Sequence, residues 1–501
     1  MSKARPVHRW AAGRGIRVLP DADALLQATL LQPFDYLFSI TNLEILPKAI
    51  LDLPSQGAIN FHDGPLPEYA GLNTPVWALL NGEPRHGVTW HLMTGAVDRG
   101  AVLTRRAFDI SEGETALTLN TKCYEAGIES FEELVRDLGE GRLRPHPQDA
   151  APGRIFRRSD RPSAAGVLDW TQSAETIATL IRALDFGTYP NPLVSPKTSH
   201  ESRAIIVQEA SLGERGSGAA PGTVLSIDDA GIQVATGDRN LVLRRLQTLD
   251  GTPLSPRDGA SRLGIAPGGR FDLPNEASVA RLTAVTAATC PHEPFWIDRL
   301  ETEHPFEVPA APLRGGVPNP LEYTHADQAP MGVGDGEEGV TAVLGYFARL
   351  GDCAEFDVGF ADPALARLVE GVSDWFAGQV PLRAAVDFAR GFDTLRESVR
   401  SELGRLRQHL TYSADLPARR PVLRSAGRGP EARPLPVSVH LVERLEDAAA
   451  PAGSALTVAV RPRDGATRWV ADRTALGAEV AEYQAQFAEF CRAATLTPER
   501  A

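Results

Sequence analysis

Several features that would point to a particular kind of function are scarce or absent in this sequence. The 501 residues include only four cysteines, Cys123, Cys290, Cys353 and Cys491, which are too widely spaced for a disulfide framework or a close-spaced zinc site. No apolar run approaches the roughly 18 residues that could cross a bilayer, and the basic start lacks the apolar stretch of a secretory signal. We therefore expect buried cysteines, no membrane association and a cytoplasmic protein, with a transit peptide as the alternative.

Positive charge is also in short supply. Lys and Arg total 51 against 64 Asp and Glu, which gives a net charge of -13. Such a chain repels phosphate backbones unless basic residues gather on one face, and the sequence contains no such segment. We expect no nucleic-acid partner. The length and the 43% hydrophobic content predict a globular chain of roughly two to four domains.

Residues 7–140 alternate short apolar runs with helical patterns. The apolar runs are 16–19 (IRVL), 35–40 (DYLFSI) and 57–62 (GAINFH), and helices are expected at 22–31 and after Pro47. This alternation predicts a parallel sheet covered by helices.

The pattern changes after about residue 150. A helix is expected at 174–183, followed by four short strands at 204–210, 222–228, 231–236 and 240–247, a spacing typical of a small barrel or sandwich. A helix is expected near Trp296, and residues 312–339, rich in Gly and Pro, are predicted to be a linker. Helices at 341–350 and 392–408, with strands at 356–360, 437–443 and 455–460, predict a second α/β unit.

The stretch INFHDGPLPEYAG at residues 59–71 carries the clearest chemical signal. Asn60 and His62 lie two residues apart at the end of a predicted strand, so their side chains share one face. Prolines and Gly71 then turn the chain away, which leaves the edge of the sheet open to a ligand. A second alternating strand, Gly87–Met93, leads to a loop that carries Asp98. Asp63, His86 and His91 are interpreted as structural, with Asp63 on the face opposite His62.

This composite pattern of NxH, LPxYxG, HGVTxH and VDxG resembles a known family. Residues 33–105 resemble the catalytic domain of formyltransferases that use 10-formyltetrahydrofolate, including methionyl-tRNA and sugar-amine formyltransferases. The resemblance implies a Rossmann-like α/β core and a functional trio of Asn60, His62 and Asp98. It also implies that a folate loop at Ile45, Leu46 and Pro47, together with Val97, binds the co-substrate. No metal is expected.

The chemistry of formyl transfer is consistent with this trio. An amine that attacks a formyl carbon creates an oxyanion, which a pre-aimed amide such as Asn60 stabilises by roughly 3 to 4 kcal/mol. His62 is expected to act as general acid and base, and Asp98 to fix its tautomer. Because position 60 is an amide and not a hydroxyl, direct transfer is favoured over a covalent acyl-enzyme.

Three domains are predicted. Residues 1–150 resemble the catalytic domain, although the strand, helix and strand that normally open the family's sheet are missing, as in a late start codon or a fragment. Residues 151–275 resemble the family's small barrel-like C-terminal subdomain. Residues 276–501 resemble part of a peptide-synthetase condensation domain without its HHxxxDG motif.

The predicted function is formylation of an aminoacyl group on a carrier protein of a nonribosomal peptide assembly line, beside an adenylation domain. One alternative is a freestanding enzyme that acts on an amino sugar or on methionyl-tRNA. Another is an inactive docking fragment of an assembly line, which the incomplete sheet motivates.

Overall fold

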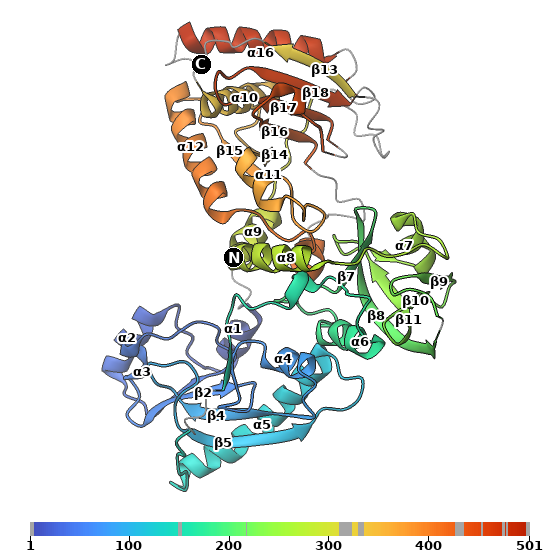
Figure 1. The fold of residues 1–501 in the computed structure, drawn as a ribbon. Coiled ribbons are helices and arrows are strands. Elements are labelled where there is room, and N and C mark those ends of the chain that lie inside the picture. Colours follow the sequence, from blue (N-terminus) through green and yellow to red (C-terminus); the bar gives the residue numbers. More distant parts are fainter. Residues whose placement is uncertain are drawn as a thin grey trace. The chain divides into compact units, whose positions relative to one another are not determined.

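A computed structural model describes most of the chain, and its residues fall into two compact units (Figure 1). The first unit comprises residues 1–160 and 182–187, and the second comprises residues 161–181 and 188–501. The predicted limits at 150 and 275 stay predictions. The described residues are 5–148, 153–216, 218–309, 323–328, 335–425, 435–451, 454–472, 476 and 479–496.

The first unit contains a four-stranded sheet in the order β1-β2-β4-β5. Its strands are β1 (Tyr36–Ser39), β2 (Gly57–His62), β4 (Arg85–Leu92) and β5 (Val102–Asp109). Only the β1–β2 pair is parallel, whereas β4 is antiparallel to both of its neighbours. The prediction of a parallel sheet is therefore correct for one pair and wrong for the rest. The connection from β4 to β5 is too short for a parallel crossover, which usually needs a dozen or more residues.

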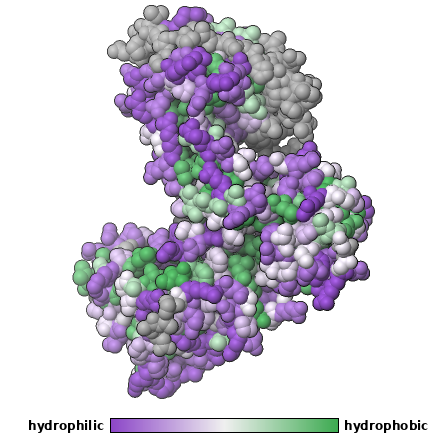
Figure 2. Space-filling model, in the orientation of Figure 1, coloured by the Kyte–Doolittle hydropathy of each residue, from purple (hydrophilic) through white to green (hydrophobic). Residues whose placement is uncertain are grey.

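The predicted strand at residues 16–19 is also wrong. These residues follow α1 (Arg5–Ala12) and precede α2 (Ala22–Leu31) without pairing with any strand of the described chain. Apolar side chains remain exposed here, with Ile16 50%, Val18 39% and Leu30 78% exposed. Figure 2 shows hydrophobic residues gathered on the visible face of the first unit over α2. An apolar run alone does not form a strand without a hydrogen-bonding partner.

Period-two alternation divides the sheet of the first unit into an apolar and a polar face. Ile59, Phe61 and Trp90 point to one face, where they pack with Phe131 and Leu134 of α5 (Ala116–Gly139). Residues between them, which include Asn60, His62 and His91, point to the other face. Shorter elements complete the unit: α3 (Lys48–Leu51), β3 (Tyr69–Gly71), α4 (Thr74–Leu80) and β6 (Arg154–Phe156).

The second unit begins with a six-stranded antiparallel sheet that packs around its own apolar core. The predicted helix is present as α6 (Ala174–Ala183), and all four predicted strands are confirmed within β8 to β11. The elements are η1 (Ser163–Gly166), α6, β7 (Lys197–His200), β8 (Arg203–Arg215), β9 (Val224–Ile227), β10 (Ile232–Ala235), β11 (Arg239–Gln247), β12 (Pro253–Leu254) and α7 (Pro256–Leu263).

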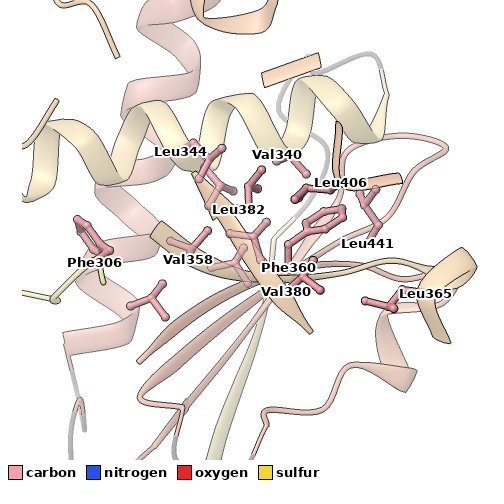
Figure 3. Close-up of a cluster of buried hydrophobic side chains, with 14 of the residues drawn as sticks. Phe306, Val340, Leu344, Val358, Phe360, Leu365, Val380, Leu382, Leu406 and Leu441 are labelled. Carbon is pink, nitrogen blue, oxygen red and sulfur yellow. The ribbon is translucent and has the colours of Figure 1, made fainter. Parts of the chain in front are cut away.

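The remainder of the second unit is the predicted α/β region. Its six-stranded mixed sheet has the order β13-β18-β17-β16-β14-β15. Figure 3 shows Val340 and Leu344 of α10 (Gly336–Leu350) facing Val358, Phe360 and Leu382 of the sheet, which form part of a large apolar core. The strands are β13 (Tyr323–Gln328), β14 (Glu355–Ala361), β15 (Val380–Ala385), β16 (Val437–Leu441), β17 (Leu456–Val460) and β18 (Thr467–Asp472).

The helices of this region include the two that were predicted, α10 (Gly336–Leu350) and α12 (Phe392–His409), and the one near Trp296, α9 (Glu293–Glu301). The others are α8 (Glu276–Thr289), η2 (Cys290–His292), α11 (Pro363–Val369), α13 (Leu416–Arg419), α14 (Pro421–Ser425), η4 (Leu445–Asp447) and α16 (Glu479–Leu496).

The predicted linker at 312–339 needs correction in part. Tyr323–Gln328 forms β13, which pairs with β18 along its whole length, and α10 begins at Gly336. Cross-strand hydrogen bonding therefore outweighs the Gly and Pro content of this segment. Most of its other residues lie outside the described part of the chain.

A buried charge network ties distant parts of the second unit together. Asp415 contacts Lys197 Nζ at 2.8 Å and Arg419 Nε at 3.1 Å, and Arg419 also contacts Glu293 at 2.5 Å. All four side chains are almost fully buried. Burial alone would raise the pKa of Asp415, but the positive charges of Lys197 and Arg419 lower it strongly, so the carboxylate stays ionised.

The cysteines bear out the expectation of burial in part. All four cysteines are free thiols; Cys123, Cys290 and Cys491 are buried, as expected, whereas Cys353 is half-buried. In the described residues, every helix is too short or too polar to traverse a bilayer.

Candidate active site

The polar face of the first unit's sheet brings the three predicted residues together. Asn60 and His62 lie on β2, and Asp98 lies in the loop between β4 and β5. His62 Nδ1 is 3.7 Å from Asp98 Oδ2. The side chain of Asn60 is half-buried, whereas His62 and Asp98 are buried, with 4% and 8% exposed.

The backbone carbonyl of Tyr69 fixes the His62 ring. His62 Nε2 lies 2.7 Å from this oxygen. Because a carbonyl only accepts, Nε2 must carry the proton, and Nδ1 of the neutral ring holds the free lone pair. The expectation that Asp98 fixes the tautomer is therefore wrong, since Asp98 lies beyond hydrogen-bond distance and Tyr69 makes this contact.

The segment from Tyr69 to Gly71 forms β3, which is anchored by β6. The Tyr69 ring stacks on Phe156 at 5.5 Å, and Phe156 stacks on Trp77 at 4.9 Å. The Tyr69 hydroxyl donates to Glu83 at 2.7 Å, and burial together with this bond raises the pKa of Tyr69 to about 12. The carbonyl that holds His62 therefore belongs to a firmly packed residue.

The other end of β3 holds Asp98. The backbone N–H of Gly71 donates to Asp98 Oδ2 at 2.8 Å, and Gln148 Nε2 donates to the backbone carbonyl of Asp98 at 2.8 Å. Asp98 itself has a left-handed φ of 53°, which Asp tolerates better than most residues. Burial would raise the pKa of Asp98, but the neighbouring His91 and His62 and the Gly71 amide together lower it.

Two residues interpreted as structural or as facing away lie next to the trio. Asp63 Oδ1 is 3.9 Å from His62 Nδ1, so Asp63 does not point away from His62 as expected. His91 Nε2 is 3.2 Å from Asn60 Nδ2 and 3.4 Å from Asp98 Oδ1. His86, by contrast, contacts the backbone carbonyl of Asp63 at 2.8 Å, which supports its structural interpretation.

A glycine gives the Asp98 loop its path. A Cβ on Gly100 would collide with the carbonyl oxygen of Leu92, whereas a Cβ on Gly95 in the same loop would meet nothing within 4 Å. We expect Gly100→Ala to displace the loop and lower stability by about 1–3 kcal/mol, with loss of any activity that depends on Asp98. Gly95→Ala should leave both unchanged. Equal melting temperatures and rates for the two variants would contradict this role of Gly100.

An amide, an imidazole with a free Nδ1 and a buried carboxylate define a site suited to direct transfer of an acyl group to a nucleophile. Within the described residues, no group of three or more His, Cys, Asp and Glu side chains could hold a metal ion.

Comparisons with known proteins agree with this class of site. Residues 23–135 match the family described as formyl transferase, and residues 162–263 match the formyl transferase C-terminal domain. The chain is 32% identical over 272 residues to the methionyl-tRNA formyltransferase of Citrifermentans bemidjiense, which covers 53% of this chain and 81% of that protein. The methionyl-tRNA formyltransferase of Trichlorobacter lovleyi is 32% identical over 247 residues, which are 48% of this chain and 75% of that enzyme.

Two solved structures are also similar. HypX from Aquifex aeolicus in complex with tetrahydrofolic acid is 19% identical, with a TM-score of 0.40, over 50% of this chain and 43% of HypX. Another is the N-formyltransferase from Helicobacter canadensis in complex with folinic acid and dTDP-3-aminofucose. It is 18% identical, with a TM-score of 0.37, over 47% of this chain and 81% of that enzyme. The identity to the curated relatives places the chain in the formyltransferase family, whose enzymes use 10-formyltetrahydrofolate as formyl donor.

Proposed function

We propose that this chain transfers the formyl group of 10-formyltetrahydrofolate directly to an amine, and that Asn60, His62 and Asp98 carry the reaction. The observation that supports it best is the convergence of these side chains on the polar face of the sheet, with His62 Nδ1 3.7 Å from Asp98. Asn60 donates from its amide to the formyl oxygen as the amine nitrogen attacks the carbon.

His62 moves the proton in this proposal. Its Nδ1 accepts a proton from the attached ammonium and returns it to the folate nitrogen as the bond from that nitrogen to the formyl carbon breaks. Asp98 and Asp63, 3.7 and 3.9 Å from Nδ1, stabilise the transient imidazolium. The bond from Nε2 to Tyr69 holds the ring while this occurs.

We further propose that the loop after β1 binds the pterin of the donor. The exposed apolar side chains there and in the Asp98 loop support this assignment, with Ile45 83% and Val97 56% exposed. Leu46 and Pro47 complete the loop, and Arg158 holds it by donating to the carbonyl of Leu43 at 3.1 Å. Because β1 and β2 are parallel, this loop leaves the sheet at the same edge as the end of β2.

The acceptor that we propose is an aminoacyl group on a carrier protein, delivered beside an adenylation domain. Charge supports this choice over tRNA, since residues 200–275 hold nine Asp and Glu against eight Arg, and the whole chain has a net charge of -13. Binding to an RNA backbone depends on an excess of basic side chains. The α/β region after residue 276, which lies beyond the family matches, is proposed as the docking element for the assembly line.

A second candidate acceptor is methionyl-tRNA, because the two relatives described above are methionyl-tRNA formyltransferases. We expect an assay with 10-formyltetrahydrofolate and three acceptors to distinguish the candidates: an aminoacyl carrier protein, methionyl-tRNA and a dTDP-amino sugar. Formylation of the carrier-bound amine alone is the predicted result. Transfer only to methionyl-tRNA or to the sugar would rule out the assembly-line acceptor.

An inactive docking fragment is the remaining alternative. Calorimetry with 5-formyltetrahydrofolate, a stable analogue of the donor, tests it without any acceptor. We expect saturable binding with one site per chain. Well-folded protein that binds no folate would favour the docking fragment over the enzyme.

A further inference from the structure

His91 connects two members of the proposed trio through one ring nitrogen. It lies on β4 directly opposite Asn60 on β2, so both side chains point to the polar face. Its Nε2 is 3.2 Å from Asn60 Nδ2 and 3.4 Å from Asp98 Oδ1. The ring is only 2% exposed, and it meets the His62 ring edge-on, with 6.4 Å between centroids.

The second nitrogen of His91 fixes its tautomer. Nδ1 lies 2.8 Å from the backbone carbonyl of Leu92 and must therefore donate. In the neutral ring, Nε2 consequently carries a lone pair and accepts from the Asn60 amide. This bond sets the direction of the amide and leaves its second N–H free to meet an acyl oxygen.

We propose that His91 is a positioning residue for formyl transfer, which aims the Asn60 amide. This inference rests on the proposed function. It assigns no proton transfer to His91, whose Nδ1 is committed to Leu92. Loss of the Nε2 contact would let the amide rotate, and misplacement of a catalytic group by about 1 Å can cost on the order of 10²-fold in rate.

Two substitutions test the roles of the two ring nitrogens of His91 separately. His91→Asn keeps a donor near Nδ1 but removes the group at Nε2, whereas His91→Gln keeps a polar group near Nε2. We expect His91→Asn to lower kcat about 10- to 100-fold and to change KM for 10-formyltetrahydrofolate less than about threefold, with His91→Gln recovering most of the loss. His146→Asn, which changes an exposed histidine of the same unit, is the control and should match the parent.

A double-mutant cycle with Asn60→Ala distinguishes positioning from a general structural role. Because His91 acts through Asn60, His91→Asn should cost less than about threefold in the Asn60→Ala background. The same 10- to 100-fold loss in both backgrounds, or an effect on KM alone, would overturn the proposal. The assay uses the acceptor that the parent accepts, so an inactive parent would count against the proposed function.

A readout that needs no turnover tests the same geometry. Long-range ¹H–¹⁵N NMR of the folded chain, with His91 assigned from the His91→Asn spectrum, reports which ring nitrogen is protonated. We expect the Nδ1–H tautomer and a shift of the Nε2 resonance in Asn60→Ala. An Nε2–H tautomer would overturn the inference even if the enzyme turns over. An Nε2 chemical shift that is the same in the parent and in Asn60→Ala would do so as well.

Discussion

Replacing His62 with alanine is expected to lower kcat for formyl transfer by about 10²- to 10⁴-fold, the usual contribution of a general acid and base. The reason is that the His62 ring is held with its Nδ1 atom available to accept a proton. Tyr69 binds Nε2 and leaves Nδ1 as the free base, whereas His91 Nδ1 donates to Leu92 and His91 Nε2 contacts Asn60. The rate would be measured at saturating donor, with formyl product quantified directly.

The control for this variant is a histidine without a role in the site. His146→Ala removes an exposed ring from the same unit and should retain the parent rate. Circular dichroism and a thermal melt would establish that His62→Ala is folded. A folded His62→Ala enzyme with activity within about tenfold of the parent would remove His62 from the acid and base role.

Replacing Asp415 with alanine is expected to destabilise the second unit by about 3–5 kcal/mol, because it leaves buried charge without a partner. Lys197 Nζ is 2.8 Å and Arg419 Nε is 3.1 Å from this carboxylate, and both cations are 1% exposed. Urea unfolding followed by the fluorescence of buried tryptophans measures the loss. The double variant Lys197→Met with Asp415→Leu should recover much of it, since an apolar pair of similar volume avoids the desolvation cost.

An exposed ion pair provides the matched control for Asp415. Asp229 contacts Arg257 at 2.6 Å, but the side chains are 90% and 61% exposed, so Asp229→Ala should leave the unfolding curve unchanged. Equal effects of the Asp415 and Asp229 variants would show that the buried network does not stabilise the fold.

The same carboxylate gives a pH dependence. The folded-state pKa of Asp415 lies below its unfolded value of about 3.9. Its contribution to stability is therefore present above about pH 4 and is lost as the pH falls below that value. Urea titrations at pH 7 and pH 3 should show a larger acid loss for the parent than for Asp415→Ala, and parallel losses would contradict the assignment.

The sequence predicted the trio but not the contacts that orient it. Asn60 and His62 share a face because side chains alternate along a strand, and this is visible in sequence spacing. The Tyr69 carbonyl could not be inferred, because a backbone acceptor leaves no trace in residue identity. The contact between His91 and Asn60 could not be inferred either, because it depends on the antiparallel register of β2 and β4, which a single sequence does not specify.

The fold shows the same division between local and non-local information. Strong periodicity located α6 and α12 to within a residue, since helical pattern is local. The errors at residues 16–19 and 323–328 both concern pairing: the first apolar run lacks a partner strand in the described chain, and the second segment gains one in β18. The likeness of residues 276–501 to a condensation domain stays a prediction.

A single-turnover experiment with a labelled formyl group on 10-formyltetrahydrofolate tests direct transfer most closely. Excess enzyme is mixed with labelled donor and with the amine that it accepts, and acid-quenched samples are separated into folate, protein and product. We expect label to pass from folate to the amine without appearing on the protein, and Asn60→Ala to slow this transfer. Label bound covalently to the protein before product forms would contradict direct transfer.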